Sequence, residues 1–279
     1  MRRVRHRHRD LRQRDVQGEV IHRWPAPLIE GRLVRRYERF IAEVRVGREL
    51  VRAHCVNPGR MEGIVAPGSR VWLSEAPGRA LPFTWELLEL DGRLLGVNTA
   101  LPNKLAGEVL RRGLLPGING DVKAEQRYGR GHRVDFIVGE RFVEVKNCHL
   151  VYPDGVGYFP DSTSERATEQ VEALRRLVKK GTPATVLFTV QRHDATRVRP
   201  SALHAPAFAT TMRRAVKAGL TTRAIALIPS LEGFTFGGEL PVDTAPYDVD
   251  ATRGFARALE ATSGWVRKDG GVSGRALKA

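Results

Sequence analysis

Cysteine is scarce in this sequence, and long apolar runs are missing. Among 279 residues there are 2 cysteines, Cys55 and Cys148, and neither has another cysteine close by. This excludes a disulfide framework and a cysteine-based zinc site, and it suits a reducing compartment. No stretch reaches the roughly 20 apolar residues of a membrane helix. The basic N-terminus is not followed by the apolar segment of a secretory signal, so we expect a cytoplasmic protein with no membrane partner.

Positive charge, by contrast, is in excess. The 46 Lys and Arg outnumber the 31 Asp and Glu, which gives a formal net charge of +15. Residues 1–15 hold seven Arg and two Asp, or +5, so the rest of the chain carries +10 (15 minus 5). A body this basic attracts polyanions, either nucleic acid or an anionic membrane, and of these we expect nucleic acid, DNA or RNA. The sequence leaves the oligomeric state open. A genome that prefers arginine codons is the alternative explanation.

The order of patterns predicts a mixed α/β protein with two domains between two tails. Residues 1–23 show no sustained apolar period and are expected to form a disordered basic tail. Across residues 24–85, short β-rich runs alternate with Gly and Pro turn signals, which is typical of an OB-like barrel that binds nucleic acid. Residues 86–241 mix strands and helices, as in a layered α/β domain. Residues 242–279 are rich in Gly, Ser, Asp and Arg, which favours a flexible tail.

One segment of the predicted barrel combines aromatic and basic side chains. Tyr37 and Phe40 lie among Arg35, Arg36 and Arg39. Such a mixture can stack on bases and clamp the backbone of a single strand. We therefore expect Arg35, Arg36, Tyr37 and Arg39 to contact nucleic acid. The alternative is that Phe40 belongs to the core and the arginines are solvated.

The second domain has clear helix and strand signals. One predicted helix begins at Ser162, which has capping-box spacing with Glu165, and ends at Gly181. Its apolar stripe predicts one face buried against the sheet. The other expected elements are helices at 102–112 and 207–217 and strands at 133–138, 141–147, 184–190 and 222–229.

The strands at 133–138 and 141–147 carry the residues most indicative of chemistry. Gly139-Glu140 between them predicts a two-residue hairpin turn, which places Asp135 directly opposite Glu144. Side chains alternate along a strand, so Lys146 shares the face of Glu144. Opposed carboxylates about 5 Å apart repel each other unless something compensates them. Mg²⁺ does so with hard oxygen ligands, and the lysine can then orient water or stabilise charge on a phosphate.

Two simpler explanations stay open for these residues. A Glu-x-Lys on a strand can be a surface ion pair of little energetic value. Glu125, ten residues before Asp135, is a candidate additional metal ligand, but it can equally be a solvent-exposed glutamate.

These residues lead to a family resemblance. The pattern Asp135, Glu144, Lys146 resembles the core of PD-(D/E)XK nucleases. More narrowly, the chain resembles the sugar fermentation stimulation protein A (SfsA) family through segments that follow one another in order across residues 28–178. The segments are LVRRYERFIAEV, HCVNPGRMEG, APGSRVWLS, TWELLEL, NTALPNKL, EQRYG, RVDF, VEVKN and GYFPDSTSER.

The resemblance implies an OB-fold domain joined to a PD-(D/E)XK nuclease-like domain. It also implies DNA binding and nuclease activity that depends on Mg²⁺ (or Mn²⁺). The site residues carried over are Glu125, Asp135, Glu144 and Lys146, and the metal would be held by the three acids and the Val145 carbonyl. The sequence departs from the family pattern in two places. Pro58 stands where many members have threonine, and Glu169-Gln170 stands where a Lys-His pair is usual.

Two residues near the start of the predicted second helix are candidates for contact with the substrate. A helix N-terminus favours phosphate, so Arg166 is expected to bind one, and Gln170 can still hydrogen-bond a phosphate or water. Alternatively, Asp161 and Ser162 only cap the helix. The preferred function is thus hydrolysis of phosphodiester bonds in DNA or RNA by a metal-dependent nuclease. The alternatives are a DNA-binding transcriptional regulator without catalysis and an RNA-binding accessory protein.

Overall fold

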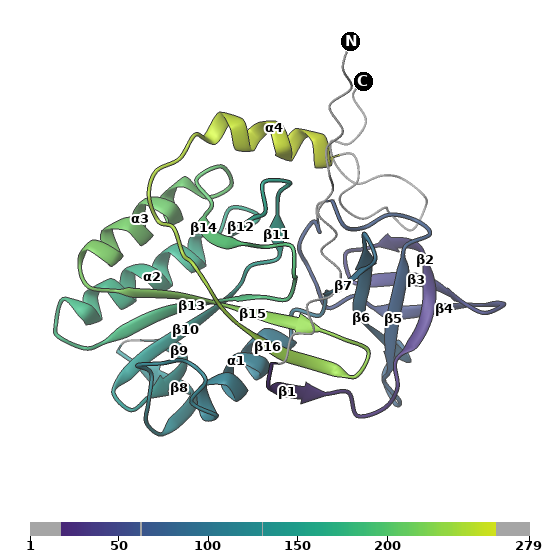
Figure 1. Ribbon diagram of the computed structural model, residues 1–279, viewed down its shortest axis with the longest axis horizontal. Coiled ribbons are helices and arrows are strands. Elements are labelled where there is room, and N and C mark those ends of the chain that lie inside the picture. Colours follow the sequence, from purple (N-terminus) through teal and green to yellow (C-terminus); the bar gives the residue numbers. More distant parts are fainter. Residues whose placement is uncertain (1–17, 62, 130, 261–279) are drawn as a thin grey trace, which may run out of the picture.

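Two lobes lie side by side in the computed structural model, a small barrel and a larger layered α/β domain (Figure 1). The structure describes residues 18–61, 63–129 and 131–260. Within these ranges, no helix is long and apolar enough to cross a membrane.

The barrel confirms the predicted N-terminal OB domain. Five strands close on themselves because β4 pairs with both β3 and β6, and β7 adds a sixth strand at the edge. The expected boundary at residue 85 was wrong, because β6 runs through it and its hairpin partner β7 ends at Gly96. The strands are β2 (Ile29–Tyr37), β3 (Ile41–Val46), β4 (Glu49–His54), β5 (Arg70–Glu75), β6 (Phe83–Leu90) and β7 (Arg93–Gly96).

The α/β domain is built on a seven-stranded mixed sheet with the order β1-β16-β15-β13-β10-β9-β8. Its central strands β10, β13 and β15 are parallel, and the strands at both edges are antiparallel. These strands are β1 (Val20–Arg23), β8 (Val122–Tyr128), β9 (His132–Val138), β10 (Arg141–Asn147), β13 (Ala184–Val190), β15 (Thr221–Pro229) and β16 (Gly233–Leu240). A second, three-stranded sheet consists of β11 (Leu150–Val151), β12 (Val156–Phe159) and β14 (Arg197–Pro200).

Helices cover both faces of the large sheet, and α2 (Glu165–Val178) buries one face against it, as its apolar stripe predicted. On one face, α1 (Leu101–Arg111) packs with residues of the barrel over a core that includes Phe136, Val143 and Val145. On the other face, α2 and α3 (Pro206–Lys217) cover Val186 and Phe188. Apolar burial on both faces holds the middle of β10 rigidly, and this strand carries the Glu-x-Lys pair.

Three details differ from the expected elements. Ser164, not Ser162, caps α2, and its hydroxyl accepts a hydrogen bond from the Ala167 N–H at 3.3 Å. Residues 20–23 are not part of a tail, because β1 pairs with β16. Likewise, α4 (Val249–Glu260) lies across the top of the domain in Figure 1, and its Phe255 and Leu259 pack on the small sheet. The rest of the two predicted tails, residues 1–17 and 261–279, lies outside the described residues.

Candidate functional site

The predicted hairpin of β9 and β10 has the expected register. Arg141 pairs with Val138, and the ladder ends at the pair of Val143 and Phe136. One more residue in the same register places Glu144 opposite Asp135, at the point where the strands stop pairing. We call this place the fork. Regular strands satisfy their own backbone groups, so a fork exposes backbone groups to which side chains or ligands can bind.

The Asp135 carboxylate accepts a backbone hydrogen bond at the point where the pairing of β9 and β10 ends. Its Oδ2 accepts a hydrogen bond from the Val145 N–H at 2.7 Å, and its Oδ1 accepts one from the side-chain amide of Asn103 on α1 at 2.8 Å. Two fixed donors therefore hold the carboxylate in one orientation at the fork.

The Val145 carbonyl points to the same side as its N–H. Phe142 N–H and Cys148 N–H donate to carbonyls of Pro183 and Thr189, on the side of β13. Successive residues in a strand alternate sides, so Val145 directs both its N–H and its C=O toward β9. This carbonyl therefore lies at the fork with Asp135, as the predicted ligand set requires.

Glu144 and Lys146 form a buried ion pair rather than a surface pair. Only 3% of Glu144 and 8% of Lys146 is exposed, and Lys146 Nζ lies 2.7 Å from Glu144 Oε1. The same ammonium group donates to Gln170 Oε1 on α2 at 2.7 Å. Gln170 therefore belongs to this site, and it holds the lysine between the strand and the helix.

Burial dominates the electrostatics of Glu144. It raises the pKa of the carboxyl, the charge of Lys146 opposes this, and the nearby charge of Asp135 raises the pKa further. The positive charge of Arg166, at the start of α2, also lowers it. Tyr128 lies on β8, where burial and then the charge of Glu144 raise the pKa of its phenol to about 12. The site thus consists of two acids and a lysine that are partly shielded from water. Arg166 is near enough to lower the pKa of Glu144.

Glu125 does not join the other two acids. Its neighbours Ala124 and Gln126 pair with Phe136 and Val134, so Glu125 stands beside Asp135 in register. However, its backbone is left-handed (φ +53°), and its exposed carboxylate accepts a hydrogen bond from Arg133 at 3.2 Å. Among the described residues, no three His, Cys, Asp or Glu side chains lie close enough to hold a metal ion. The expected ligand set that included Glu125 is therefore not assembled.

The remaining oxygens still suit one kind of ion. Mg²⁺ commonly uses only one or two protein carboxylates and keeps several waters. Asp135, Glu144 and the Val145 carbonyl provide hard oxygen ligands of this number and type. A softer or cysteine-bound metal does not fit, because no sulfur or imidazole ligand lies among them.

Two of the four residues of the barrel that were predicted to contact nucleic acid are buried, so these two predictions were wrong. Arg36 and Tyr37 are buried (2% and 1% exposed), so neither is available to a nucleic acid. The Arg36 guanidinium instead donates to the carbonyls of Arg39, Asn57 and Gly59, at 2.7 to 3.0 Å. The expected alternative for Phe40 was also wrong, because this ring is exposed.

The two other predicted contacts in the barrel lie nearer the surface. Arg35 forms a two-point ion pair with Glu43, and its guanidinium lies 4.9 Å from the Tyr37 ring centroid. Arg39 lines a cavity between the lobes. Their contact with nucleic acid stays a prediction.

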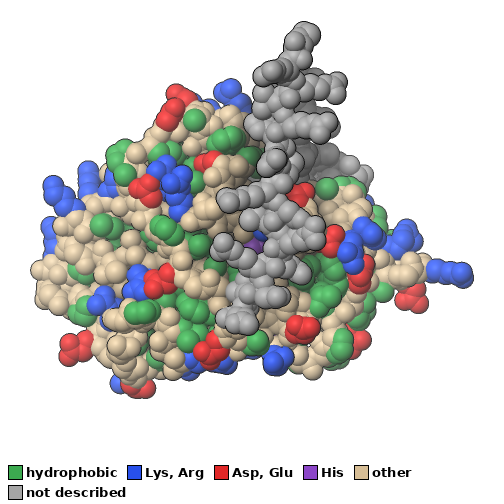
Figure 2. Space-filling model, in the orientation of Figure 1, with side chains coloured by type: hydrophobic (Ala, Val, Ile, Leu, Met, Phe, Trp, Pro, Cys, Tyr) green, Lys and Arg blue, Asp and Glu red, His purple; other side chains and the backbone are tan. Residues whose placement is uncertain are grey.

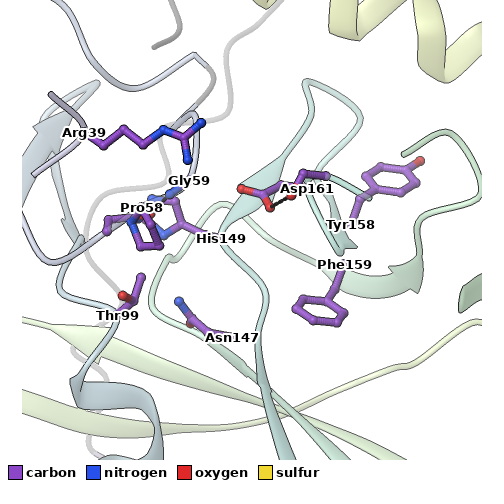
Figure 3. Close-up of a pocket in the computed structure, with 11 residues that line it drawn as sticks. Arg39, Pro58, Gly59, Thr99, Asn147, His149, Tyr158, Phe159 and Asp161 are labelled. Carbon is purple, nitrogen blue, oxygen red and sulfur yellow. Dashed lines mark hydrogen bonds between the residues drawn. The ribbon is translucent and has the colours of Figure 1, made fainter. Parts of the chain in front are cut away.

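Neither this cavity nor part of the fork is indicated by the sequence. Asn103 and Tyr128 contribute to the fork, but no spacing signal connects them to it. The cavity has a volume of about 390 Å³ and combines the loop at residues 57–59 with the ends of β10 and β12 (Figure 3). Its two contributing segments, HCVNPGRMEG and GYFPDSTSER, had stood out in the sequence as separate motifs.

Comparison with known proteins agrees with this architecture. A family model described as the SfsA N-terminal OB domain matches residues 34–97, and another, described as the sugar fermentation stimulation protein RE domain, matches residues 100–233. A sugar fermentation stimulation protein homolog from Methylobacterium sp. (strain 4-46) is 45% identical over 216 residues, which cover 72% of this chain and 90% of the relative. Its counterpart from Brucella ovis is 40% identical over 213 residues, which cover 72% and 89%.

A solved structure extends the agreement to three dimensions. Pyrococcus furiosus SfsA in complex with Ca²⁺ matches with a TM-score of 0.73 at 26% identity, over 81% of this chain and 100% of that chain. The order of the two domains, the sequence relatives and the structural match agree, and the chain therefore belongs to the sugar fermentation stimulation protein (SfsA) family.

Proposed function

We propose that this protein is a nuclease of the PD-(D/E)XK type that binds DNA or RNA and hydrolyses its phosphodiester bonds with a divalent metal ion. The observation that carries the proposal is the fork, where Asp135 and Glu144 face each other and Lys146 Nζ contacts Glu144. Opposed carboxylates at the end of a ladder cost stability. Such an arrangement is favourable where a cation and a phosphate are to be bound.

Asp135, Glu144 and the Val145 carbonyl would hold Mg²⁺ or Mn²⁺. Bound there, the ion would lower the pKa of a coordinated water and offset charge on the phosphate. The Ca²⁺ complex of Pyrococcus furiosus SfsA supports a site for a hard divalent cation in this fold. Asn103 keeps the Asp135 carboxylate oriented, because it donates to the oxygen that Val145 N–H does not use.

Lys146 has the position of a residue that binds the reacting group. Its ammonium has three N–H donors. Two of them are used by Glu144 and Gln170, and the third can donate to a phosphate oxygen or to the attacking water. A lysine that is held from two sides loses little further entropy when it does so, which is how positioned charges stabilise a transition state.

Basic side chains near the fork would hold the strand. Arg166 lies in the first turn of α2, where the positive end of the helix dipole also favours phosphate. On the face drawn in Figure 2, Lys and Arg side chains lie over both lobes and alternate with acidic ones instead of forming one patch. We infer that the strand is held by a series of separate phosphate contacts, in which Arg39 also takes part.

A DNA-binding regulator without catalysis is the second candidate. The observation that favours it is the ion pair itself, because Lys146 already offsets the charge of Glu144 without any metal. In that case the acids would be structural, and the basic surface would be the functional part.

A cleavage assay tests the proposal. Labelled single- and double-stranded DNA and RNA are incubated with the purified protein in Mg²⁺, in Mn²⁺ and in EDTA. We expect cleavage with either metal and none in EDTA, and loss of cleavage in Glu144→Gln. Glu140→Gln is the matched control, because it makes the same change on the exposed turn of the same hairpin. Cleavage that persists in EDTA or in Glu144→Gln contradicts the proposal, as does a wild-type protein that cleaves none of the substrates.

A further inference from the structure

The cavity between the lobes has a mixed apolar and polar lining, and two of its buried side chains, Asn57 and His149, can donate hydrogen bonds. Asn57 comes from the loop after β4 of the barrel. Asn147, the last residue of β10, and His149 follow the Glu-x-Lys pair (Figure 3). Asn57 and His149 are 4% and 9% exposed, and Asp161 and Arg39 are nearer the surface. Among the described residues, Asp161 is the one acidic residue that lines the cavity.

Asn57 lines this cavity and has one amide atom, the nitrogen Nδ2, that is not hydrogen-bonded among the described residues. Its Oδ1 accepts a hydrogen bond from the Gly59 N–H at 2.9 Å, which fixes the orientation of the amide. Among the described residues, its buried Nδ2 has no hydrogen-bond partner. A buried amide without a partner costs free energy, so it favours an acceptor from outside the protein.

His149 adds a second group of this kind. Its buried Nε2 likewise lacks a partner within the described part of the chain. Burial, with the charges of Arg192 and Arg36, lowers the pKa of this histidine to about 3, so the ring is neutral and one of its nitrogens carries a hydrogen. The ring can thus donate to an acceptor without bringing a charge of its own.

Arg36 makes the buried end of the cavity positive. It lies behind the 57–59 loop and donates to the Asn57 and Gly59 carbonyls, and its buried Nη1 has no partner among the described residues. The Gly59 position lets Asp161 approach this loop, since a Cβ there would lie 2.8 Å from Asp161 Oδ2. Donors and a cation at the buried end favour an anion that enters with its oxygens first, whereas the Asp161 carboxylate, nearer the surface, opposes it.

We propose that this cavity binds the phosphate group of a nucleotide, with Asn57 Nδ2 and the His149 ring as donors and Arg36 as the source of positive potential. The nucleotide is either free or the 5′-phosphorylated end of a strand, and the cavity volume of about 390 Å³ is of the size that such ligands occupy. The site is separate from the fork and requires neither metal nor hydrolysis.

Calorimetry in EDTA tests the proposal with inorganic phosphate, adenosine 5′-monophosphate and adenosine. We expect the two phosphate compounds to bind and adenosine to bind at least about tenfold more weakly. Competition by an oligonucleotide with a 5′-phosphate, but not by its 5′-hydroxyl counterpart, would identify a strand end as the ligand. Competition by neither would identify a free nucleotide. Equal binding of adenosine, or no binding of either phosphate compound, would overturn the proposal.

Two substitutions should change the affinity for adenosine 5′-monophosphate in opposite directions. Asn57→Asp keeps the acceptor for Gly59 N–H but replaces the donor with a negative charge, so affinity should fall about tenfold or more. Asp161→Asn removes the carboxylate near the phosphate, so affinity should rise. Asn119→Asp makes the same change as Asn57→Asp at an exposed position, and it should leave the affinity unchanged. If Asn57→Asp does not fold, Asp161→Asn decides alone, and an unchanged or lower affinity in that variant overturns the proposal.

Discussion

The fork and the cavity both contain buried polar side chains, but they differ in whether these side chains have hydrogen-bond partners within the described protein. At the fork, Asp135, Glu144 and Lys146 all have hydrogen-bond partners within the protein. In the cavity, Asn57 and His149 each have a buried nitrogen without a partner among the described residues. The difference separates two kinds of site. The fork can fold without a ligand and exchange its internal partners for a metal and a phosphate. The two cavity nitrogens have no partner to exchange within the described part of the chain, so they gain one when a ligand binds.

The largest expected effect is on catalysis. Asp135→Asn and Lys146→Ala should each lower cleavage by at least about a thousandfold, because one removes a metal ligand and the other removes a cation from the reacting group. In EDTA, their effects on nucleic acid binding should have opposite signs. Binding should stay equal or tighten in Asp135→Asn and weaken slightly in Lys146→Ala. Filter binding and a gel assay measure both, and cleavage at the wild-type rate in either folded variant would point to a contaminating nuclease.

The next effect concerns the compensation of charge at the fork. Lys146→Met leaves Glu144 buried without its cation, so the variant should lose roughly 3 kcal/mol of unfolding free energy at pH 8 in EDTA. Burial already raises the pKa of Glu144 in the folded state. A carboxyl whose pKa is raised on folding destabilises the protein when it is ionised and not when it is protonated. The loss should therefore shrink as the pH falls toward 5. A loss that is the same at pH 8 and pH 5 in urea titrations would show that Glu144 is not its cause.

The same raised pKa gives metal binding a pH dependence. The metal requires the ionised carboxylate, and protonation of Glu144 competes with it from a pH above the usual range for glutamate. Affinity for Mn²⁺ should therefore fall with decreasing pH, by up to about tenfold per pH unit below the pKa of this group. Isothermal titration across pH 5 to 8 measures this. Phosphate binding in the cavity should not depend on Glu144, so Glu144→Gln should leave it unchanged.

The smallest expected effect is on stability, through the two hydrogen bonds that orient the Asp135 carboxylate. Its two carboxylate oxygens accept hydrogen bonds from Val145 N–H and from the Asn103 side chain. An asparagine at this position has one accepting oxygen and one donating NH₂ group, so it can satisfy only one of these donors. Asp135→Asn should therefore cost about 1 kcal/mol of stability, in spite of the repulsion it relieves. Asn103→Ala should cost a similar amount. Thermal unfolding compares the two, and a stabilised Asp135→Asn would mean that repulsion from Glu144 outweighs the lost hydrogen bond.

Local rules were sufficient to predict the hairpin at the centre of the fork. Gly139-Glu140 fixed the turn, and alternation then placed Asp135 opposite Glu144 with Lys146 on the same face. The same rules gave the helices near 101–111 and 206–217 and the fully buried strand at 184–190. These features depend on residues that are close in sequence, so patterning and turn chemistry decide them.

Features that depend on distant residues could not be predicted in the same way. A bulge in β2 between Leu33 and Arg35 shifts the register against β3, so simple alternation does not show that Arg36 and Tyr37 face inward. The burial of Arg36 also depends on carbonyls of the 57–59 loop, which a propensity argument does not include. The cavity brings this loop to residues 147–162, and only the packing of the two lobes does that.

Binding of Mn²⁺ to the purified protein, measured by electron paramagnetic resonance, tests the central claim that the fork is a divalent metal site. We predict a bound ion in the wild-type protein that is lost in Asp135→Asn and Glu144→Gln and retained in Glu140→Gln. The cavity variant Asn57→Asp should also retain it, because the fork and the cavity are separate sites. No bound Mn²⁺ at millimolar concentration, or binding that survives both fork substitutions in folded protein, would contradict the claim.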